Sequence, residues 1–468
     1  MTNTLRYHEV RSPQSWNPLD AAMRLCHGSP FHDFVLYEKD GIWYYAGGSV
    51  AQILVNSREA IVSWPGKNAR VRWVDSPLPV VSGLLNECPV DSWSAFGWAA
   101  FELSYSLHGL KPPQSGLPLM RLDIPHTEAI ISPTGAVVRS VSRAVAAECL
   151  EVLESTADYV PRDPVQVPTS AGQTEYCAAV EAAIADIRAG LLEKVIVSRR
   201  VPVGRVIDMA ATYRVGREAN TPARSFLLRH DGMEAAGFSP EIVVKVDGAG
   251  RAITQPLAGT RAYGRNPDDD RALSAELRSD PKEVYEHAIS MRSSWLELGT
   301  VCAPGSVRVD EPMGLRFRGT VQHLASVVSG QLAAGRTPLD ALGAVFPAVT
   351  ASGIPKPEAC SCISRLEPTA RGLYAGSVFR LDSSGDLDAA LVLRSVFQAG
   401  GSAWLQAGAG IVSASRPERE FEETREKLAS VARHVVPAAD GIVPAVGSAG
   451  LAVPGRRTLA GTAPGGGS

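Results

Sequence analysis

The sequence lacks long hydrophobic runs and an excess of charge of one sign. No stretch of its 468 residues approaches the run of about 18 apolar residues that a membrane-spanning helix needs, and no apolar segment follows the first charge near the N-terminus. We therefore expect a cytoplasmic protein with neither a membrane span nor a secretory signal. Lys and Arg number 46 against 49 Asp and Glu, a net charge of −3, which predicts no nucleic acid or anionic membrane as a partner.

Cysteine pairs and nucleotide-binding motifs are also missing. The seven cysteines are an odd number, lie far apart and include no CxxC pair. This disfavours a disulfide framework or a zinc site and predicts free thiols in a reducing compartment. No glycine segment beside a strand-like run follows GxGxxG or GxxxxGK(S/T), which excludes a dinucleotide-binding fingerprint and a P-loop.

The chain divides into three regions by composition. Apolar residues make up 45% of it and charged residues 20%, so disorder along the whole length is excluded. Residues 1–165 hold short apolar runs, such as 34–37 and 129–131, which predict strands of an antiparallel sheet. Residues 166–436 hold longer helix and strand patterns in alternation. Residues 437–468, rich in Gly, Ala and Pro, predict a disordered tail.

A lysine begins one strand pattern of the middle region. Residues 175–189 predict a helix with Thr174 as its N-cap, and residues 194–198 then predict a strand. Alternation places Lys194 on the face opposite to Val195. A lysine at the start of a strand is usually a solvated edge residue, and the pattern alone favours that interpretation.

A second helix is predicted from Pro281, with Asp280 as its N-cap. One stripe of this helix is apolar and consists of Val284, Ala288, Met291, Trp295 and Leu298. The opposite face carries Glu283, Glu286, Ser290, Ser293 and Ser294. By default the polar face meets water. Serines are short, however, and would also let another surface or a ligand come close, so both interpretations stay open.

A third helix carries many acids. Ser415 and Glu418 form the S-x-x-E pattern of a capping box and predict its N-terminus. Glu420, Glu423 and Lys427 lie together at the border of its apolar stripe. Two carboxylates three residues apart repel each other unless a cation neutralises them. Either Lys427 or Mg²⁺ could neutralise the two carboxylates, so the pattern leaves a structural and a metal-binding interpretation open.

Four segments place glycines beside strand-like runs. They are residues 235–241, 256–260, 374–376 and 406–410. Any one of them is most simply a bulge or a turn, but each lies next to a polar or ionisable residue, which favours one shared pocket. Glu241 directly precedes an apolar strand, where partial burial would raise the pKa of its carboxyl group.

The middle region resembles the chorismate-binding enzymes, a family that includes anthranilate, aminodeoxychorismate, isochorismate and salicylate synthases. The matching motifs appear in family order: EKVIVSR at 193–199, GFSPE at 237–241, QPLAGTR at 255–261, SDPKEVYEH at 279–287, VQHL at 321–324, FPAVTASGIPK at 346–356, RGLYAG at 371–376, LDAALVLR at 387–394, and residues 406–427. The resemblance implies an α+β fold of two large antiparallel β-sheets packed as a sandwich with helices on the outside. The N-terminal region would complete these sheets.

Two positions help to choose among the reactions of this family. Lys194 stands where ammonia-using members typically carry glutamine, and in water-using members this lysine is the base that activates water. Ala258 stands where aminodeoxychorismate synthases carry a lysine nucleophile. The chain contains no fused glutamine amidotransferase sequence, and we expect no such partner. The motifs at 255–261 and 346–356 resemble the salicylate synthases most.

The resemblance also implies roles for individual residues. Lys194 would be the base, Glu241 the general acid, and His323 a supporting catalytic residue. Substrate-binding residues would be Gly259, Thr260, Tyr374, Arg394, Gly408, Ala409, Gly410 and Lys427. The ligands of a Mg²⁺ cofactor would be Glu286, Glu420 and Glu423.

The implied function is that of a monomeric, magnesium-dependent salicylate synthase. Such an enzyme converts chorismate through isochorismate to salicylate and pyruvate, and the product would feed siderophore assembly. The first alternative is an isochorismate synthase that lacks the pyruvate-releasing step. The second and less favoured alternative is the large component of an anthranilate synthase.

Overall fold

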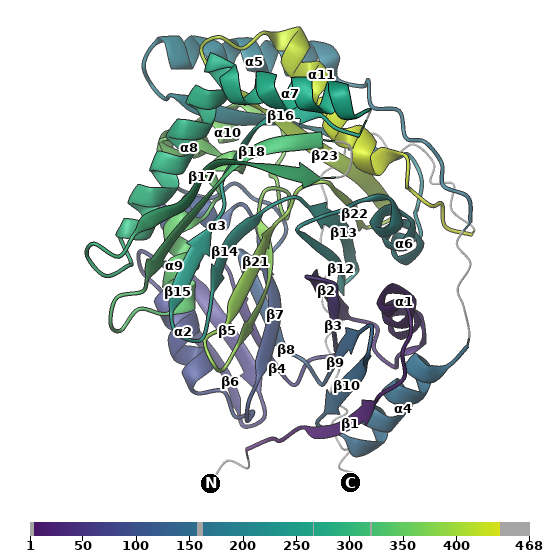
Figure 1. The fold of residues 1–468 in the computed structure, drawn as a ribbon. Helices are drawn as coiled ribbons and strands as arrows, with labels where there is room; N and C mark the ends of the chain where they lie inside the picture. Colours follow the sequence, from purple (N-terminus) through teal and green to yellow (C-terminus); the bar gives the residue numbers. More distant parts are fainter. Residues whose placement is uncertain (1–3, 157–161, 265, 319–320, 440–468) are drawn as a thin grey trace, which may run out of the picture.

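All strands that the structure describes belong to two antiparallel β-sheets, with helices around them (Figure 1). The structure is a computed structural model and describes residues 4–156, 162–264, 266–318 and 321–439. The predicted α+β fold with two large antiparallel sheets is therefore confirmed.

The first sheet has eleven strands. In spatial order they are β1 (His8–Ser12), β10 (Gly135–Ser140), β9 (Thr127–Ser132), β3 (Ile42–Gly47), β2 (Phe34–Lys39), β12 (Arg224–His230), β13 (Met233–Ser239), β22 (Ser395–Ala399), β23 (Ser402–Ile411), β11 (Lys194–Pro202) and β19 (Gly353–Ile354). The short β19 pairs only with the first two residues of β11, so beyond Val195 no described strand pairs with this edge of β11, called its free edge below.

The second sheet has twelve strands. In spatial order they are β16 (Leu257–Ala262), β18 (Val321–Gln331), β15 (Arg251–Thr254), β14 (Ile242–Val246), β21 (Leu387–Leu391), β20 (Ser377–Asp382), β7 (Ser94–Ala99), β8 (Met120–Ile124), β4 (Ala51–Val55), β5 (Glu59–Trp64) and β6 (Lys67–Arg72), and β17 (Arg308–Arg318) also pairs with β18.

Helices surround the two sheets. They are α1 (Pro18–Gly28), α2 (Leu78–Asn86), α3 (Leu103–Leu107), α4 (Arg143–Glu154), α5 (Gln173–Arg188), α6 (Met209–Ala219), α7 (Pro267–Ser279), α8 (Pro281–Gly299), α9 (Pro338–Val345), α10 (Lys356–Leu366) and α11 (Pro417–Ala432), with a short 3₁₀ turn at Val349–Ala351. Figure 1 shows α5, α7, α8 and α11 gathered at one end of the molecule. None of the described helices is long and apolar enough to cross a bilayer.

Early and late parts of the chain share both sheets. In the first sheet β2 pairs with β12, so Leu36 lies opposite Leu227. In the second sheet β7 pairs with β20, so Trp98 lies opposite Val378. The sequence boundary near residue 165 therefore does not separate two sheets.

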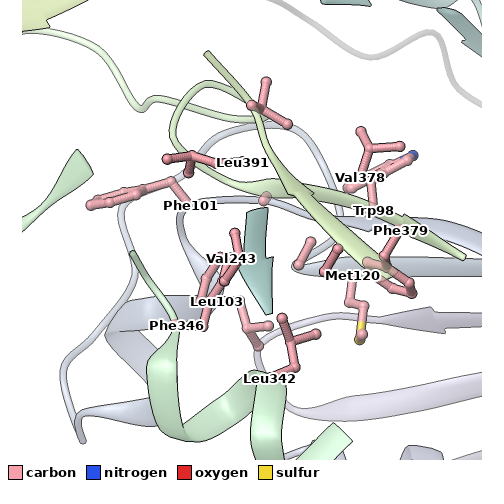
Figure 2. Packing of buried hydrophobic residues seen from close by; sticks show 14 of the residues in the cluster. Trp98, Phe101, Leu103, Met120, Val243, Leu342, Phe346, Val378, Phe379 and Leu391 are labelled. Atoms are coloured by element: carbon pink, nitrogen blue, oxygen red, sulfur yellow. The ribbon is translucent and has the colours of Figure 1, made fainter. Parts of the chain in front are cut away.

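Large apolar side chains fill the space around the second sheet. Figure 2 shows Val243 beside Leu103 and Phe346, near Leu342 of α9, while Trp98, Val378 and Phe379 gather on the other side of the same cluster. These side chains are fully or almost fully buried. Glu241 lies just before β14, next to this core, and is itself 2% exposed.

Two of the predicted helix caps are wrong. Helix α5 begins at Gln173, and Gly172 with φ 77° precedes it, so Thr174 lies inside the first turn. Helix α11 begins at Pro417 without a side-chain cap, because the Ser415 hydroxyl instead accepts a hydrogen bond from the Val412 N–H at 3.1 Å. The predicted tail lies outside the described residues from 440 onward.

For α8 the default interpretation, a polar face that meets water, is wrong, and the alternative that the sequence left open holds. Of the expected apolar stripe only Leu298 is buried, whereas Trp295 is 44% exposed. The helix instead buries Glu283, His287, Ser290 and Ser294 together with Leu298. The polar face is turned inward because it covers a polar cavity, and its serines allow the close approach that the sequence left open.

Candidate functional site

A cavity of about 450 Å³ lies among α8, α11, β11, β16 and β23. All four glycine-containing segments contribute to its lining, so the predicted shared pocket is confirmed. The predicted site residues that line it are Lys194, Glu241, Gly259, Thr260, Glu286, His323, Tyr374, Arg394, Gly408, Gly410, Glu423 and Lys427.

Two predicted residues do not line this cavity. Ala409 is fully buried in the hydrophobic core, because strand alternation turns it away from the face that carries Gly408 and Gly410. Glu420 is only 1% exposed and lies behind the lining. Its Oε2 atom has no hydrogen-bond partner among the described residues.

Lys194 is a buried residue, not the solvated edge residue that its position on the strand favoured. It is 1% exposed, and its Nζ lies 2.8 Å from Glu286 Oε1. The same nitrogen donates to the Ser290 hydroxyl at 3.3 Å. An added side chain at Gly410 would meet Glu286 Oε1 at 2.8 Å, so glycine is what allows α8 to approach β23 here. The result is an amine held inside the cavity wall.

Glu241 is a carboxyl group in dry surroundings. It is 2% exposed, and burial raises its pKa to about 8, although the Thr350 hydroxyl donates to Oε1 at 2.9 Å. The Oε2 atom has no partner among the described residues. The group is therefore protonated at neutral pH and able to donate a proton or a hydrogen bond to a ligand.

His323 faces the cavity as a neutral ring. Burial lowers its pKa to about 3. Its Nδ1 lies 3.2 Å from the carbonyl oxygen of Gly259, which can only accept, and 3.0 Å from the Thr260 hydroxyl, which can accept or donate, so a proton on Nδ1 satisfies both contacts. Nε2 consequently carries a lone pair, and this atom is buried without a partner in the described part of the chain. It is suited to accept a hydrogen bond from a ligand hydroxyl.

Arg394 and Tyr374 form a second polar group in the lining. Arg394 has φ 52°, a left-handed backbone that costs energy for a residue other than glycine and is typical of functional sites. No carboxylate of the described residues forms an ion pair with it, and burial lowers the pKa of its guanidinium. Burial likewise raises the pKa of Tyr374, which keeps its hydroxyl protonated. Together they offer donors suited to a carboxylate.

Four carboxylates gather at one side of the cavity, and each has its own basic partner. The pairs are Glu283 with Arg261 at 3.1 Å, Glu286 with Lys194 at 2.8 Å, Glu423 with Lys427 at 2.7 Å, and Glu420 with Lys282 at 3.6 Å. Burial and the neighbouring Glu423 raise the pKa of Glu420. Burial alone would raise the pKa of Glu423 as well, but Lys427, Lys282 and Arg419 together outweigh burial and lower that pKa.

These carboxylates suit a hard cation but do not form a complete ligand set. Within the described residues, no three His, Cys, Asp or Glu side chains stand close enough to hold a metal ion as they are. Mg²⁺ prefers oxygen ligands and is commonly held by one or two protein carboxylates with water completing the shell. The unpartnered, buried Oε2 of Glu420 and the converging Glu286 and Glu423 fit that requirement.

Sequence patterns missed several residues of the site. Thr350 lies in an aperiodic stretch, so nothing marked its contact with Glu241. Arg261 bonds Glu276, Asp280 and Glu283 and so ties the starts of α7 and α8 to β16. Its partner Asp280 was recognised only as a helix cap, although it also accepts a hydrogen bond from Arg261 at 2.8 Å. Only the spatial arrangement reveals these contacts.

Comparisons with known proteins agree with the resemblance. The profile of the family described as chorismate binding enzyme matches residues 34–433. A salicylate synthase from Mycolicibacterium paratuberculosis is 42% identical over 407 residues, which cover 86% of this chain and 90% of that protein. An anthranilate synthase component 1 from Thermus thermophilus is 41% identical over 267 residues, 57% of this chain and 58% of that protein.

A solved structure shares the fold. The anthranilate synthase component I from Streptococcus pneumoniae matches with a TM-score of 0.71 and 25% sequence identity. The match covers 84% of this chain and 92% of that one. The likeness therefore includes the N-terminal strands as well as the region that carries the motifs.

Proposed function

Because the chain belongs to the chorismate-binding enzymes, we propose that it is a magnesium-dependent salicylate synthase, which converts chorismate through isochorismate to salicylate and pyruvate. The salicylate would serve siderophore assembly. The salicylate synthase that matches 86% of this chain supports the proposal. The observation that carries it is the pairing of a buried amine, Lys194, with a carboxyl group, Glu241, that is protonated at neutral pH, both on one cavity.

In the proposed first step, water replaces the hydroxyl group of the substrate ring. The Lys194 amine, once unprotonated, takes a proton from a water molecule whose oxygen forms a bond to C2. The bond between C4 and its oxygen breaks as the ring double bonds shift, and Glu241 gives its proton to the departing hydroxyl group, which leaves as water. The high pKa of Glu241 keeps that proton available near neutral pH.

Other residues hold the substrate. Arg394 and Tyr374 would bind the enolpyruvyl carboxylate, since both line the cavity as donors and neither has a carboxylate partner among the described residues. His323 would accept a hydrogen bond at Nε2, where the structure leaves a lone pair unused. Lys427, which donates to the Gly408 carbonyl at 2.9 Å, adds positive charge near the same strand.

Glu286 and Glu423 are the residues proposed to hold Mg²⁺, with Glu420 in support. When bound, Mg²⁺ supplies a positive charge that fixes the ring carboxylate of the substrate. Arg261 of β16 donates to Asp280 and Glu283 at the start of α8 and so ties the helix that carries Glu286 to the second sheet.

The proposed second step releases pyruvate from isochorismate. The bond between C3 and the enolpyruvyl oxygen breaks while the hydrogen on C2 passes to the methylene carbon of the departing group. The ring becomes aromatic, and no separate base is needed. The cavity contributes by holding the side chain over the ring and by excluding water.

Product analysis tests the proposal. Purified protein is incubated with chorismate and Mg²⁺, and the products are separated by chromatography. Equal amounts of salicylate and pyruvate are expected. Isochorismate alone would replace the proposal with an isochorismate synthase, anthranilate formed only with added ammonium would replace it with an anthranilate synthase, and the absence of turnover would overturn it.

Substitution of Glu423→Gln tests the metal ligands. Removal of one carboxylate charge is expected to weaken Mg²⁺ binding by roughly tenfold or more, measured by titration calorimetry, and to raise the Mg²⁺ concentration that activity requires. Glu422→Gln is the matched control, because Glu422 lies on the same helix and pairs with Arg425 on the surface. Unchanged Mg²⁺ affinity in Glu423→Gln would show that the ligand assignment is wrong.

Lys282 is expected to oppose the metal. Its ammonium lies near all four carboxylates, and its ion pair with Glu420 is the longest of the four at 3.6 Å. Lys282→Met should therefore tighten Mg²⁺ binding by roughly tenfold, since one competing charge is gone. It should also lower the melting temperature without the metal. Lys245→Met on β14 is the control, and equal affinities in both variants would contradict the expectation.

A further inference from the structure

A second cavity, of about 400 Å³, lies over the free edge of β11. The start of α5 forms one wall, residues 366–369 form another, and Trp404 of β23 forms the floor with Pro202. Gln406 lines this cavity and the candidate site alike, and its Nε2 donates to the Ser198 hydroxyl at 2.9 Å. The two cavities are thus neighbours separated by a pair of polar side chains.

Arg199 brings an uncompensated charge to this cavity. Its side chain is buried, at 7% exposure. Its guanidinium donates to Thr424 Oγ1 at 2.7 Å and to the carbonyl oxygens of Ala171 and Thr169 at 2.9 and 2.7 Å, and all three acceptors are neutral. No carboxylate in the described ranges forms an ion pair with it. A buried charge is normally paired, so this one is an exception that calls for an anion.

Arg200 brings a second charge with unused donors. Its guanidinium carbon lies 3.5 Å from the ring centroid of Trp404. It makes neither a hydrogen bond nor an ion pair with any side chain that the structure describes, and burial lowers its pKa to about 10 with no carboxylate opposing the shift. A guanidinium presents five N–H donors in a flat fork that matches a carboxylate.

The acids around the cavity do not neutralise these two charges. Glu367 lines it, but both of its oxygens accept from Arg371, at 2.9 Å for Oε2 from Nε. Glu175 at the start of α5 is exposed and forms no ion pair with a described residue. With Glu367 neutralised by Arg371, the lining keeps the charges of Arg199 and Arg200 against the single exposed carboxylate of Glu175, beside the Trp404 ring.

The backbone adds a further donor. The N–H groups of Ile196 and Ser198 point away from β23, to Ser352 O and Glu367 Oε1, both at 2.8 Å. The alternation of an antiparallel ladder turns the N–H of Arg200 to the same free edge. This N–H lies on the edge of β11, and the guanidinium of the same residue lies over Trp404, another residue of the cavity lining.

We propose that this cavity is a binding site for a small aromatic carboxylate. The carboxylate group lies against the Arg200 guanidinium and N–H, and the ring lies beside Trp404. The buried guanidinium of Arg199 attracts the carboxylate electrostatically without contacting it. The site is distinct from the candidate active site, and its existence does not depend on which reaction that site performs.

Titration calorimetry with benzoate tests the proposal. Full-length protein carrying Arg394→Ala is used, so that the candidate active site lacks its own carboxylate-binding arginine. Benzoate is expected to bind one site, acetate to bind roughly tenfold more weakly because it lacks the ring, and benzamide to bind weakest because it lacks the charge. Benzamide binding as tightly as benzoate would overturn the proposal.

Variants locate the binding. When Arg200→Ala is added to the Arg394→Ala protein, the affinity for benzoate should fall by roughly tenfold or more. Arg200→Lys should lower the affinity less, because lysine keeps the positive charge but lacks the paired N–H donors of a guanidinium. Arg72→Ala, at the distant end of β6, should leave binding unchanged. Melting curves verify that each variant is folded, and Arg200→Lys supplies the comparison if Arg200→Ala does not fold. Absence of benzoate binding, or equal binding with and without Arg200, would overturn the proposal.

Discussion

Replacement of Lys194 by methionine is expected to lower kcat for chorismate by roughly a thousandfold, because a positioned general base contributes on that scale. Methionine keeps the apolar stem of the side chain but removes the nitrogen that lies 2.8 Å from Glu286. The substrate would still be held by Arg394 and Tyr374, so KM should change far less than kcat. Steady-state kinetics on the two proteins measure both quantities.

A second buried lysine gives the matched control. Lys356 is 6% exposed, and its Nζ lies 2.9 Å from Glu297 Oε2, but it does not line the cavity. Lys356→Met thus also removes a buried lysine–glutamate pair, and we expect it to lower the free energy of unfolding. The protein that folds should keep a kcat close to that of the parent. Equal losses of kcat in the two variants would mean that Lys194 acts only through the fold.

Glu241→Gln is expected to lower kcat by roughly a hundredfold and to stabilise the protein above neutral pH. Glutamine has the shape of the protonated carboxyl group and still accepts from the Thr350 hydroxyl, but it cannot give up a proton. Loss of the acid accounts for the fall in kcat. Activity near pH 7 and the melting temperature at about pH 8.5 are the two measurements.

The direction of the stability effect follows from the pKa of Glu241. In the folded protein burial raises it from 4.5 to about 8, so the folded state holds the proton more tightly than the unfolded state. The favourable contribution is complete below about pH 4.5 and is lost as the pH rises through about 8. Glutamine has no such loss, and Glu241→Gln should melt roughly 5 °C higher at alkaline pH. A melting temperature below that of the parent protein throughout would contradict the burial argument.

Local patterns predicted some parts of this site well. Strand alternation placed Lys194 opposite the core residue Val195, and the position of Glu241 before an apolar strand predicted its raised pKa. Both rest on neighbours in sequence. The default interpretation of α8 failed because the burial of Ser290 and Ser294 depends on residues far away in the sequence and not on neighbours within the helix.

Other parts depend on long-range contacts that no local pattern encodes. The pairing of β2 with β12 joins residues almost 190 positions apart, as in the contact between Glu38 and Ser225. The family resemblance implied the two sheets, whereas the strand patterns alone did not. The same holds for Thr350, which reaches Glu241 across 109 positions.

Incubation of the protein with chorismate and Mg²⁺ in water labelled with the heavy isotope of oxygen tests water addition in this cavity most directly. If Lys194 activates water that bonds to C2, the phenolic oxygen of the salicylate comes from the solvent. Mass spectrometry should then find one heavy oxygen in each salicylate molecule, and the Lys194→Met variant should form almost no salicylate in the same time. Salicylate that forms without the label would contradict the account, because its oxygen would not have come from water.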